Sequence, residues 1–426
     1  MTALVIGTAV SGRAAASLLR SLGDKVIVYD ADPAAIEGVD ADEVHGGPWK
    51  PSLLDGIDLV ITSPGVPEHA PPVRDSLASG LPIWSELELG FRHLRCPVVA
   101  VTATNGKTTV TELAARMLRS SGLDAAAAGN IGDPLCGAVG HDWDVVVVEA
   151  SSFQLRFVDT FHADAAVLLN VAPDHLDWHG SFDAYAAAKA RILERQTPDD
   201  VVIYDADDEG ASTLVAGARS QRVPVSGRAR PDGGWGPEGG ALVIAGLEIP
   251  LEQIPRRDPV MLVDVAAAAQ AALHVGATPG GVLSAVTEFT SGPHRRQFIG
   301  TWNGVAWVDD SKATNPHAAL AAIRDHGPVV LIAGGRNKGL DVGGLPLEPN
   351  VRQVFAIGEA AAELAATGGP VTIVATLEEA VAAADHASRP GDTVLLAPGC
   401  ASFDMFRSYA DRGERFAAAV LARKRA

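Results

Sequence analysis

With 426 residues, of which 47% are hydrophobic and 20% charged, the chain has the composition of a globular protein and is long enough for two to four domains. Its formal net charge of −18 argues against nucleic acid as a partner, because phosphate backbones are bound by broad basic surfaces. An anionic ligand must therefore meet local positive charge, which helix N-termini, isolated lysines and metal ions provide.

The sequence argues against both membrane insertion and disulfide bonding. No uninterrupted apolar stretch approaches the roughly 18 residues of a membrane span. The start, "MTALVIGTAVSGR", lacks a basic leader with a cleavage site, so we expect a cytoplasmic protein. Cys96, Cys136 and Cys400 are odd in number, far apart and without CxxC spacing. We expect them to pack in cores rather than to form disulfides or a zinc site.

Residues 1–91 show the alternation of a Rossmann-like domain. A strand at 3–7, the turn "GTAVSG", a helical run at 13–23 and a strand at 25–30 make a β-α-β unit. A third apolar run contains the turn Ser63-Pro64-Gly65 and continues the pattern.

A second series of alternating runs predicts a central domain over 92–291, again with a parallel sheet. Its runs are "PVVAVTATNGKTT", "DVVVVEASSF", "DAAVLLNVAPDH", "SFDAYAAAKARIL" and "DVVIYDADD". Residues 227–251 are rich in Gly and Pro and contain short β-like runs, so we predict a small hairpin insertion there. The stretch "SGPHRRQ", at 291–297, predicts a linker.

A third series predicts a C-terminal domain over 292–426. Its strand runs are "VAWVDDSKATN", "VVLIAGGRNKG", "VRQVFAIGEA", "PVTIVAT" and "DTVLLAPGCASFD", each followed by a helical run. The predicted fold is three consecutive α/β domains with mainly parallel sheets, of which the first and third are Rossmann-like.

The stretch "TATNGKTT" predicts a phosphate-binding loop. A strand ends here, Gly106 lets the backbone turn closely, and a helix begins whose free N–H groups and positive dipole end face the turn. Lys107 can reach terminal phosphates, and the Thr108 hydroxyl can bind Mg²⁺, which indicates a nucleoside triphosphate. The match to GxxxxGK[ST] is incomplete, because Val101 occupies the first glycine position. A plain helix start is the alternative.

Glu149 ends the strand "DVVVVE", at the sheet edge where parallel strands deliver ligand-binding groups. A carboxylate there could take the Mg²⁺ held by Thr108. A solvated acid at a strand end is the alternative, which the four preceding valines disfavour.

Motifs along nearly the whole chain resemble those of the Mur ligase family, the ATP-dependent amide-forming enzymes of peptidoglycan synthesis. They are "TATNGKTT", "GNIG" (129–132), "EASSFQL" (149–155), "NVAPDHLDWH" (170–179), "AAKARIL" (187–193), "GPHR" (292–295), "DDSKATN" (309–315) and "APGCASFDMF" (398–406). "SSFQL" and "DSKATN" point to the members that add D-glutamate. Ala103 departs from the glycine usual before TNGK, which would tighten the loop and leave Lys107 and Thr108 in place.

The resemblance implies a reaction and its partners. The γ-phosphoryl group of ATP passes to a substrate carboxylate, the amine of D-glutamate attacks the acyl phosphate through a tetrahedral intermediate, and phosphate leaves. The substrates would be UDP-N-acetylmuramoyl-L-alanine and D-glutamate, with ATP and two Mg²⁺ ions as cofactors, and we expect a monomer. Such chemistry needs concentrated positive charge and positioning.

The resemblance assigns the nucleotide and metal sites residue by residue. Lys107, His175 and Lys189 would be catalytic. The ATP-binding residues would be Thr104, Asn105, Gly106, Lys107, Thr108, Thr109, Arg295, Asp310 and Lys312, with Arg296 as an alternative to Arg295. The metal ligands would be Thr108, Glu149, His175 and Lys189.

Lys189 would act as a metal ligand after carbamylation by CO₂. That reaction needs a neutral amine, so burial or nearby cations must lower its pKa from about 10.4. A lysine on a helical run usually lies on a solvated surface, which is the alternative.

Two substrate sites follow from the same resemblance. The UDP substrate would be bound by Val10, Ser11, Gly12, Asp30, Ser63, Pro64, Gly65, Asn130, Ser152 and Gln154. D-Glutamate would be bound by Thr314, Lys338, Ser402, Phe403 and Tyr409, of which Tyr409 departs from the expected phenylalanine. A dicarboxylate needs a cation and hydroxyl or backbone donors, which this set offers. Turn, packing and surface ion-pair roles are the alternatives.

Other functions are weighed against this one. Asp174, His175, Asp177 and His179 also permit a zinc site, but phosphate chemistry suits oxygen-liganded Mg²⁺. Another Mur-type ligase or a folylpolyglutamate synthetase-like ligase is the nearest alternative, although the Asp-Asn-Pro-Arg signature of the diaminopimelate enzyme is absent. A P-loop switch leaves the third domain unexplained. A nicotinamide oxidoreductase would need GxGxxG, and the turn has only Gly7 and Gly12.

Overall fold

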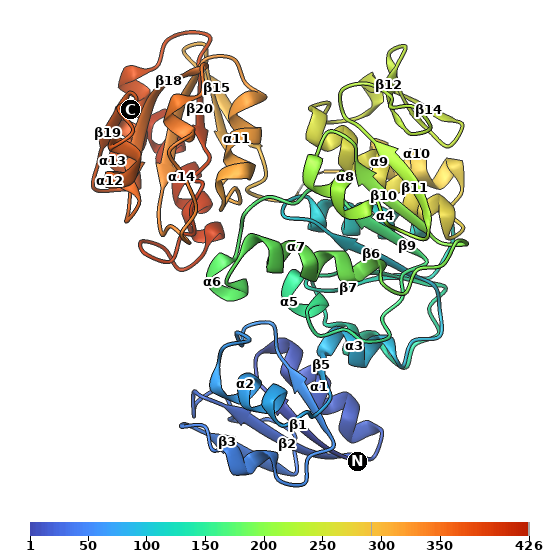
Figure 1. Cartoon of the computed structure of the whole chain (residues 1–426). Helices are drawn as coiled ribbons and strands as arrows, with labels where there is room; N and C mark the ends of the chain where they lie inside the picture. The colour runs from blue at the N-terminus through green and yellow to red at the C-terminus, as the bar shows by residue number, and fades with distance from the viewer. Residues whose placement is uncertain (291, 425–426) are drawn as a thin grey trace. The chain divides into compact units, whose positions relative to one another are not determined.

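A computed structural model describes residues 1–290 and 292–424 (Figure 1). The chain divides into two compact units. Unit 1 comprises Met1–Val171 and Trp178–Phe289, and unit 2 comprises Ala172–Asp177 with the described part of Thr290–Ala426. Both contain mainly parallel sheets flanked by helices, so the predicted α/β class is confirmed.

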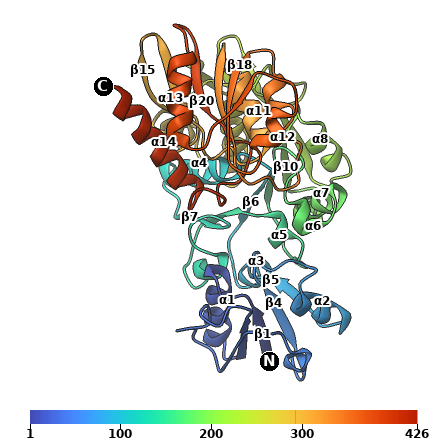
Figure 2. The same cartoon turned by 90° about the vertical axis from the view of Figure 1, so that its left-hand side faces the viewer.

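The N-terminal sheet of unit 1 is entirely parallel, in the order β3-β2-β1-β4-β5. Its strands are β1 (Thr2–Ile6), β2 (Lys25–Asp30), β3 (Glu43–Gly46), β4 (Leu59–Thr62) and β5 (Ile83–Ser85). Helices α1 (Val10–Ser21) and α2 (Pro71–Ala78) lie on opposite sides of the strands in Figure 2. Alternate strand residues enter separate cores on the two faces, as in a parallel sheet covered on both sides.

The central sheet of unit 1 is also parallel, in the order β11-β10-β9-β6-β8-β7. Its strands are β6 (Val98–Thr102), β7 (Ala125–Gly129), β8 (Val145–Glu149), β9 (Ala165–Leu168), β10 (Val201–Asp205) and β11 (Gln221–Val225). The helices of this region are α4 (Lys107–Ser120), α5 (Ser152–Leu155), α6 (Leu176–His179), α7 (Phe182–Ala190), α8 (Glu209–Val215), α9 (Pro259–His274) and α10 (Pro279–Thr287). The continuous apolar runs noted in the sequence are the buried strands.

The predicted hairpin insertion is a three-stranded antiparallel sheet. Its strands β12 (Gly236–Glu238), β13 (Ala241–Ile244) and β14 (Leu247–Pro250) are ordered β12-β13-β14. The prediction was short by one strand, because β12 has only three residues and contains a proline.

The sheet of unit 2 has the order β15-β16-β20-β17-β18-β19, with β15 antiparallel to β16 and the other neighbours parallel. The strands are β15 (Gln297–Trp302), β16 (Val305–Asp309), β17 (Val329–Gly334), β18 (Val351–Ile357), β19 (Val371–Ile373) and β20 (Thr393–Leu396). The helices are α11 (Pro316–Arg324), α12 (Ala361–Ala365), α13 (Leu377–Ala387) and α14 (Tyr409–Lys424).

The predicted linker at 291–297 is partly built into unit 2. Its first residue, Ser291, lies outside the described residues, and strand β15 begins at Gln297. His294 is buried, and its Nδ1 lies 2.7 Å from Oδ2 of the buried Asp309. His294 of the predicted linker therefore belongs to unit 2, where its ring completes a buried polar pair.

Two buried glutamates join the N-terminal and central sheets within unit 1. Both belong to α3 (Glu86–Phe91), which follows β5. Glu86 Oε1 accepts a hydrogen bond of 2.6 Å from Cys136 N. The Glu88 carboxylate accepts from the backbone N–H groups of Asp159, Thr160 and Phe161. Buried carboxylates paired in this way hold neighbouring segments in register.

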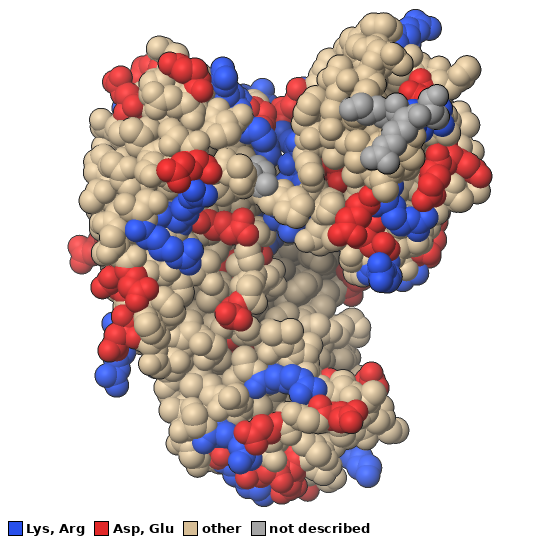
Figure 3. Space-filling model, turned by 180° about the vertical axis from the view of Figure 1, so that it is seen from behind, with Lys and Arg blue, Asp and Glu red and all other residues tan. Residues whose placement is uncertain are grey.

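The surface carries acidic and basic side chains in small groups, with uncharged residues between them on the face in Figure 3. Within residues 1–290 and 292–424, no helix is long and apolar enough to cross a membrane. The cysteines are unpaired; Cys136 and Cys400 are buried as expected, whereas Cys96 is half-buried.

Candidate active site

The predicted phosphate loop connects β6 to α4, at the carboxyl edge of the central sheet. Gly106 adopts φ 95° at the start of the helix, and a Cβ there would lie 2.9 Å from Asp264 Oδ1. The preceding turn is held by Asn170, which accepts from the N–H groups of Thr104 (2.9 Å, through its carbonyl) and Asn105 (2.8 Å, through Oδ1). The strand, the positive-φ glycine and the helix that the sequence predicts are therefore all present.

Two lysines converge on one carbonyl of this loop. Lys107 Nζ donates to the oxygens of Ala103 (2.7 Å) and Thr104 (3.1 Å), and Lys189 Nζ donates to the same Ala103 oxygen at 2.7 Å. Ala103 is buried and is not among the described non-glycine residues with positive φ, so the departure from glycine causes no backbone strain. The result is a concentration of positive charge beside a helix N-terminus.

Lys189 is 1% exposed, although a helical lysine usually lies in solvent. It is held against the ring of Tyr185, with Nζ 4.6 Å from the ring centroid. Tyr185 Oη in turn lies 2.9 Å from Thr104 Oγ1. Helix α7 is thus tied to the phosphate loop at two points, and no sequence pattern predicted the contact that Tyr185 makes with this loop.

Glu149 has the environment of a metal ligand. It is 3% exposed at the end of β8, opposite Val101 of β6, where the phosphate loop begins. Its Oε1 accepts from Asn130 Nδ2 at 2.8 Å, whereas Oε2 has no hydrogen-bond partner among the described residues. A buried carboxylate oxygen without a donor is costly unless a cation or water satisfies it. Mg²⁺, which prefers such oxygens, fits this position.

The zinc alternative finds no support in the geometry. Within the described part of the chain, no group of three or more His, Cys, Asp or Glu side chains is placed to hold a metal ion. His179 Nε2 lies 2.9 Å from Ser152 Oγ, and its ring stacks on Phe153. His175 belongs to unit 2 and has φ 52°, a strained conformation that is concentrated at functional sites.

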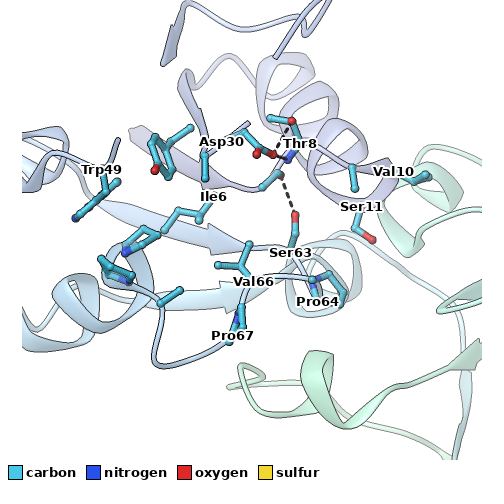
Figure 4. Close-up of a pocket in the computed structure, with 18 of the residues that line it drawn as sticks. Ile6, Thr8, Val10, Ser11, Asp30, Trp49, Ser63, Pro64, Val66 and Pro67 are labelled. Atoms are coloured by element: carbon cyan, nitrogen blue, oxygen red, sulfur yellow. Dashed lines mark hydrogen bonds between the residues drawn. The ribbon is translucent and has the colours of Figure 1, made fainter. Parts of the chain in front are cut away.

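A cavity of about 1190 Å³ lies over the carboxyl ends of β1, β2 and β4 (Figure 4). It is lined by seven of the residues predicted for the UDP substrate: Val10, Ser11, Asp30, Ser63, Pro64, Gly65 and Asn130. Its wall also includes Gly129, the last residue of β7, and Pro134 in the segment that follows, so residues near the N-terminal and the central sheets of unit 1 enclose it. Open α/β sheets bind ligands at this edge.

Asp30 is preorganised as an acceptor in this cavity. Its Oδ2 accepts from the N and Oγ1 of Thr8, both at 2.8 Å, and Oδ1 accepts from Asp32 N at 3.0 Å. Burial alone would raise the pKa of the carboxyl, but these hydrogen bonds outweigh burial and leave the pKa below its ordinary value. Trp49, which sequence reasoning missed, also lines the cavity and packs edge-on against Tyr29.

Three residues predicted for the UDP substrate lie outside the cavity wall. Gly12 is buried in the first turn of α1. Ser152 pairs with His179. Gln154 is 1% exposed, and its Oε1 accepts from Ser151 N and Oγ in a helix capping box. The contacts of Gln154 are therefore those of the packing alternative. The Ser-x-x-Gln spacing, which is typical of a capping box, could have indicated this.

Unit 2 contains the remaining candidates for the nucleotide. The guanidinium of Arg296 pairs with Asp325 and approaches Asp310, whereas Arg295 makes no hydrogen bond or ion pair with the described residues. This favours Arg295 over Arg296 as the ligand-binding arginine. Lys312 Nζ lies 4.9 Å from the ring centroid of Tyr409, and Asp310 is buried beside the Arg296 backbone.

The five candidates for D-glutamate lie in unit 2, mostly on loops after β16, β17 and β20. Lys338 Nζ pairs with Asp174 Oδ1 at 2.8 Å. Burial would raise the pKa of Asp174, but the charges of Lys338 and His175 outweigh burial and lower it. Ser402 is buried, Phe403 is two-thirds exposed, and Tyr409 begins α14. Thr314 is half-buried beside the backbone of Lys312.

Comparison with known proteins identifies the family. Residues 101–230 match the Mur ligase middle domain, and residues 294–400 match the Mur ligase glutamate ligase domain. A protein of Frankia casuarinae named UDP-N-acetylmuramoylalanine--D-glutamate ligase is 42% identical, with 99% of this chain and 94% of the relative covered. The chain belongs to the Mur ligase family. Seven further relatives, 36% to 38% identical, carry the same name.

Solved Mur ligases and a pseudomurein peptide ligase share the fold. A pseudomurein peptide ligase of Methanothermus fervidus superimposes with a TM-score of 0.63 at 17% identity, over 99% of both chains. MurF ligase of Thermotoga maritima, solved with ADP, superimposes with a TM-score of 0.58 at 18% identity, over 88% of this chain and 91% of that one.

Gly12 allows a close contact on which the cavity of this Mur ligase depends. A Cβ at position 12 would lie 1.8 Å from the Gly7 carbonyl oxygen and 2.9 Å from Ser63 Oγ. We expect Gly12→Ala to destabilise the fold by about 1–3 kcal/mol, because the first turn of α1 must move away from β1. Thermal unfolding measures the loss. Gly65→Ala is the control, since its Cβ meets nothing within 4 Å; equal melting temperatures for the two variants would contradict the steric argument.

Proposed function

We propose that this protein joins D-glutamate to UDP-N-acetylmuramoyl-L-alanine with ATP, through an acyl phosphate. The observation that carries the proposal is the nearly full-length similarity to eight relatives named for that ligation, and the strand, positive-φ glycine and helix N-terminus at the predicted phosphate loop support it. Ligation of these precursors belongs to cytoplasmic peptidoglycan synthesis, where we place the reaction.

The proposed phosphoryl transfer depends on charge gathered at the phosphate loop. Lys107 already lies over the loop carbonyls, so its Nζ needs only to exchange those oxygens for phosphate oxygens. Glu149 and Thr108 would hold a Mg²⁺ ion, which would neutralise part of the negative charge of the phosphates. His175 is proposed as a ligand of a second ion. Arg295, Asp310 and Lys312 are proposed as further nucleotide-binding residues.

Lys189 is proposed to carry a carbamate. Burial and a neighbouring cation both favour the neutral amine that must react with CO₂, and Lys189 has both. Carbamylation would turn one of two cations on the Ala103 carbonyl into an anion able to approach Mg²⁺. The repulsion between the two ammonium groups would then be relieved.

The acceptor carboxylate would enter from the cavity of unit 1. Asp30 and the turn after β4 are proposed to bind the nucleotide end of the substrate, and Asn130 lies both in the cavity wall and against Glu149. One residue thus connects the substrate cavity with the proposed metal ligand. Lys338, with the loop donors of unit 2, would bind the carboxylates of D-glutamate.

Phosphate release tests the proposed function. With ATP, Mg²⁺ and UDP-N-acetylmuramoyl-L-alanine present, we expect D-glutamate to stimulate release and L-alanine, diaminopimelate or D-alanyl-D-alanine not to. If the acceptor carboxylate carries ¹⁸O, the label should enter the released phosphate, because the acyl phosphate transfers one carboxylate oxygen. Stimulation by another amino acid alone would reassign the substrate, and unlabelled phosphate would exclude the acyl phosphate.

Lys107→Ala should leave a folded protein whose turnover is lower by two or more orders of magnitude, since a charge-stabilising group is lost. Folding should persist because Lys107 Nζ bonds the carbonyls of its own loop. Steady-state kinetics and thermal unfolding together measure the effect. Lys25→Ala, at an exposed pair with Glu43, is the matched control; near-normal turnover of Lys107→Ala would count against the assigned role.

Carbamylation predicts a dependence on CO₂. In buffer stripped of CO₂ we expect activity to fall and bicarbonate to restore it. With ¹³C-bicarbonate, NMR should show a carbamate carbon in the wild type that is missing in Lys189→Arg, which keeps a cation but cannot be modified. Full activity without CO₂, together with no carbamate signal, would remove the modification from the mechanism.

A further inference from the structure

One arginine of α14 is completely buried beneath the loops of unit 2. Arg412 has 0% exposure. Its Nε donates to Ser311 Oγ (3.0 Å), and Nη2 donates to the Ser311 carbonyl (2.9 Å) and, more weakly, to the Cys400 carbonyl (3.3 Å). Nη1 donates to the Cys400 carbonyl at 3.2 Å. The planar fork therefore spans two segments that are 89 positions apart in sequence.

These segments follow adjacent parallel strands. Ser311 follows β16 and Cys400 follows β20, at the sheet edge where α/β folds bind ligands. The loop after β17 joins them, because Arg336 and Ala401 exchange backbone hydrogen bonds of 2.9 and 3.0 Å. At Gly335 in that loop, a Cβ would lie 3.3 Å from Arg412 Nη1. Arg412 thus underlies three neighbouring loops.

The same loops bear the candidates for D-glutamate. Thr314 follows Ser311, Lys338 follows Gly335, and Ser402 and Phe403 follow Cys400. Tyr409 is reached through Ser311, whose Oγ donates to the Tyr409 carbonyl at 2.7 Å. Four of the candidates therefore follow, in the chain, a residue that contacts or lies beside the Arg412 guanidinium. The fifth, Tyr409, is hydrogen-bonded to one of these residues.

A purely structural role explains this arrangement poorly. The acceptors of Arg412 are neutral carbonyl and hydroxyl oxygens, and among the described residues the carboxylates of Asp404 and Asp309 act on its charge only from beyond hydrogen-bond distance. Burial lowers its pKa to about 10, and the group remains charged at neutral pH. Apolar residues of similar volume often stabilise a core more than a buried charge does. A buried cation under these loops does favour an anionic ligand above them.

We propose that Arg412 is the positioning residue of the amino-acid site, which sets the geometry of its three loops and gives it fixed positive charge suited to a dicarboxylate. This inference rests on the proposed function, because the site is defined by the D-glutamate candidates. It assigns Arg412 no contact with substrate.

Steady-state kinetics of Arg412→Met and Arg412→Lys test the proposal. Methionine keeps most of the apolar volume and removes every donor, whereas lysine keeps the charge without the fork. We expect the KM for D-glutamate to rise about tenfold or more in Arg412→Met, since displaced loops misplace the ligand, and the KM for ATP to stay within about twofold. Arg412→Lys should lie between the wild type and Arg412→Met.

Arg423→Met is the matched control, because Arg423 lies on the same helix and pairs with Asp385 at the surface. Its KM values should equal those of the wild type. An unchanged KM for D-glutamate in a folded Arg412→Met, or equal increases in the KM values of all substrates, would overturn the proposal. Equal increases would indicate general structural damage.

Ser311→Ala keeps the test decisive if Arg412→Met fails to fold. It removes the acceptor of Arg412 Nε and the donor to the Tyr409 carbonyl, and we expect a severalfold rise in the KM for D-glutamate alone. No rise would overturn the proposal. The wild type is assayed first: absence of D-glutamate-stimulated phosphate release there would defeat the proposed function and the inference with it. An active wild type with unaffected variants would defeat only the inference.

Discussion

The shared carbonyl of Ala103 is the contact that joins the phosphate loop to helix α7 in unit 1. Two lysine ammonium groups, one from the phosphate loop and one from helix α7, donate to this oxygen. Cations do not gather in a buried place unless the site is built for anions, because desolvation and mutual repulsion both oppose it. The helix N-terminus beside them adds positive potential of the same sign.

The two compact units hold their buried or half-buried positive charges in different ways. In unit 1 the ammonium group of Lys107 bonds loop carbonyls, which the proposed function would have it exchange for a phosphate. In unit 2 the charge of Arg412 is immobile, held by bonds to Ser311 and Cys400. Mobile charge suits a phosphoryl group that is transferred, and fixed charge suits an amino acid that must be oriented for attack.

The cavity of unit 1 shows how small residues permit a ligand site. Gly12 lets the first turn of α1 approach the Gly7 carbonyl, and Asp30 is held by the backbone and hydroxyl of Thr8. Glu86 bonds the backbone of Cys136, in the segment after β7 that also bears the cavity-lining Asn130, whereas Glu88 bonds residues 159–161. Packing, rather than any one ligand contact, therefore determines the shape of the site.

The α/β class, the phosphate loop and seven residues of the cavity wall could be predicted from the sequence, because glycine turns, apolar strand runs and "TNGKTT" are local signals. Family membership was equally readable, since its motifs occur in order along the chain. Only the tertiary structure shows that Lys189 and His294 are buried, that Gln154 belongs to a capping box, and that Arg296 pairs with Asp325. It also places Asp264, Tyr185 and Arg412 beside Gly106, Thr104 and Ser311, which lie 158, 81 and 101 positions away in the sequence. Burial and long-range pairing arise when distant segments meet, and no local pattern records them.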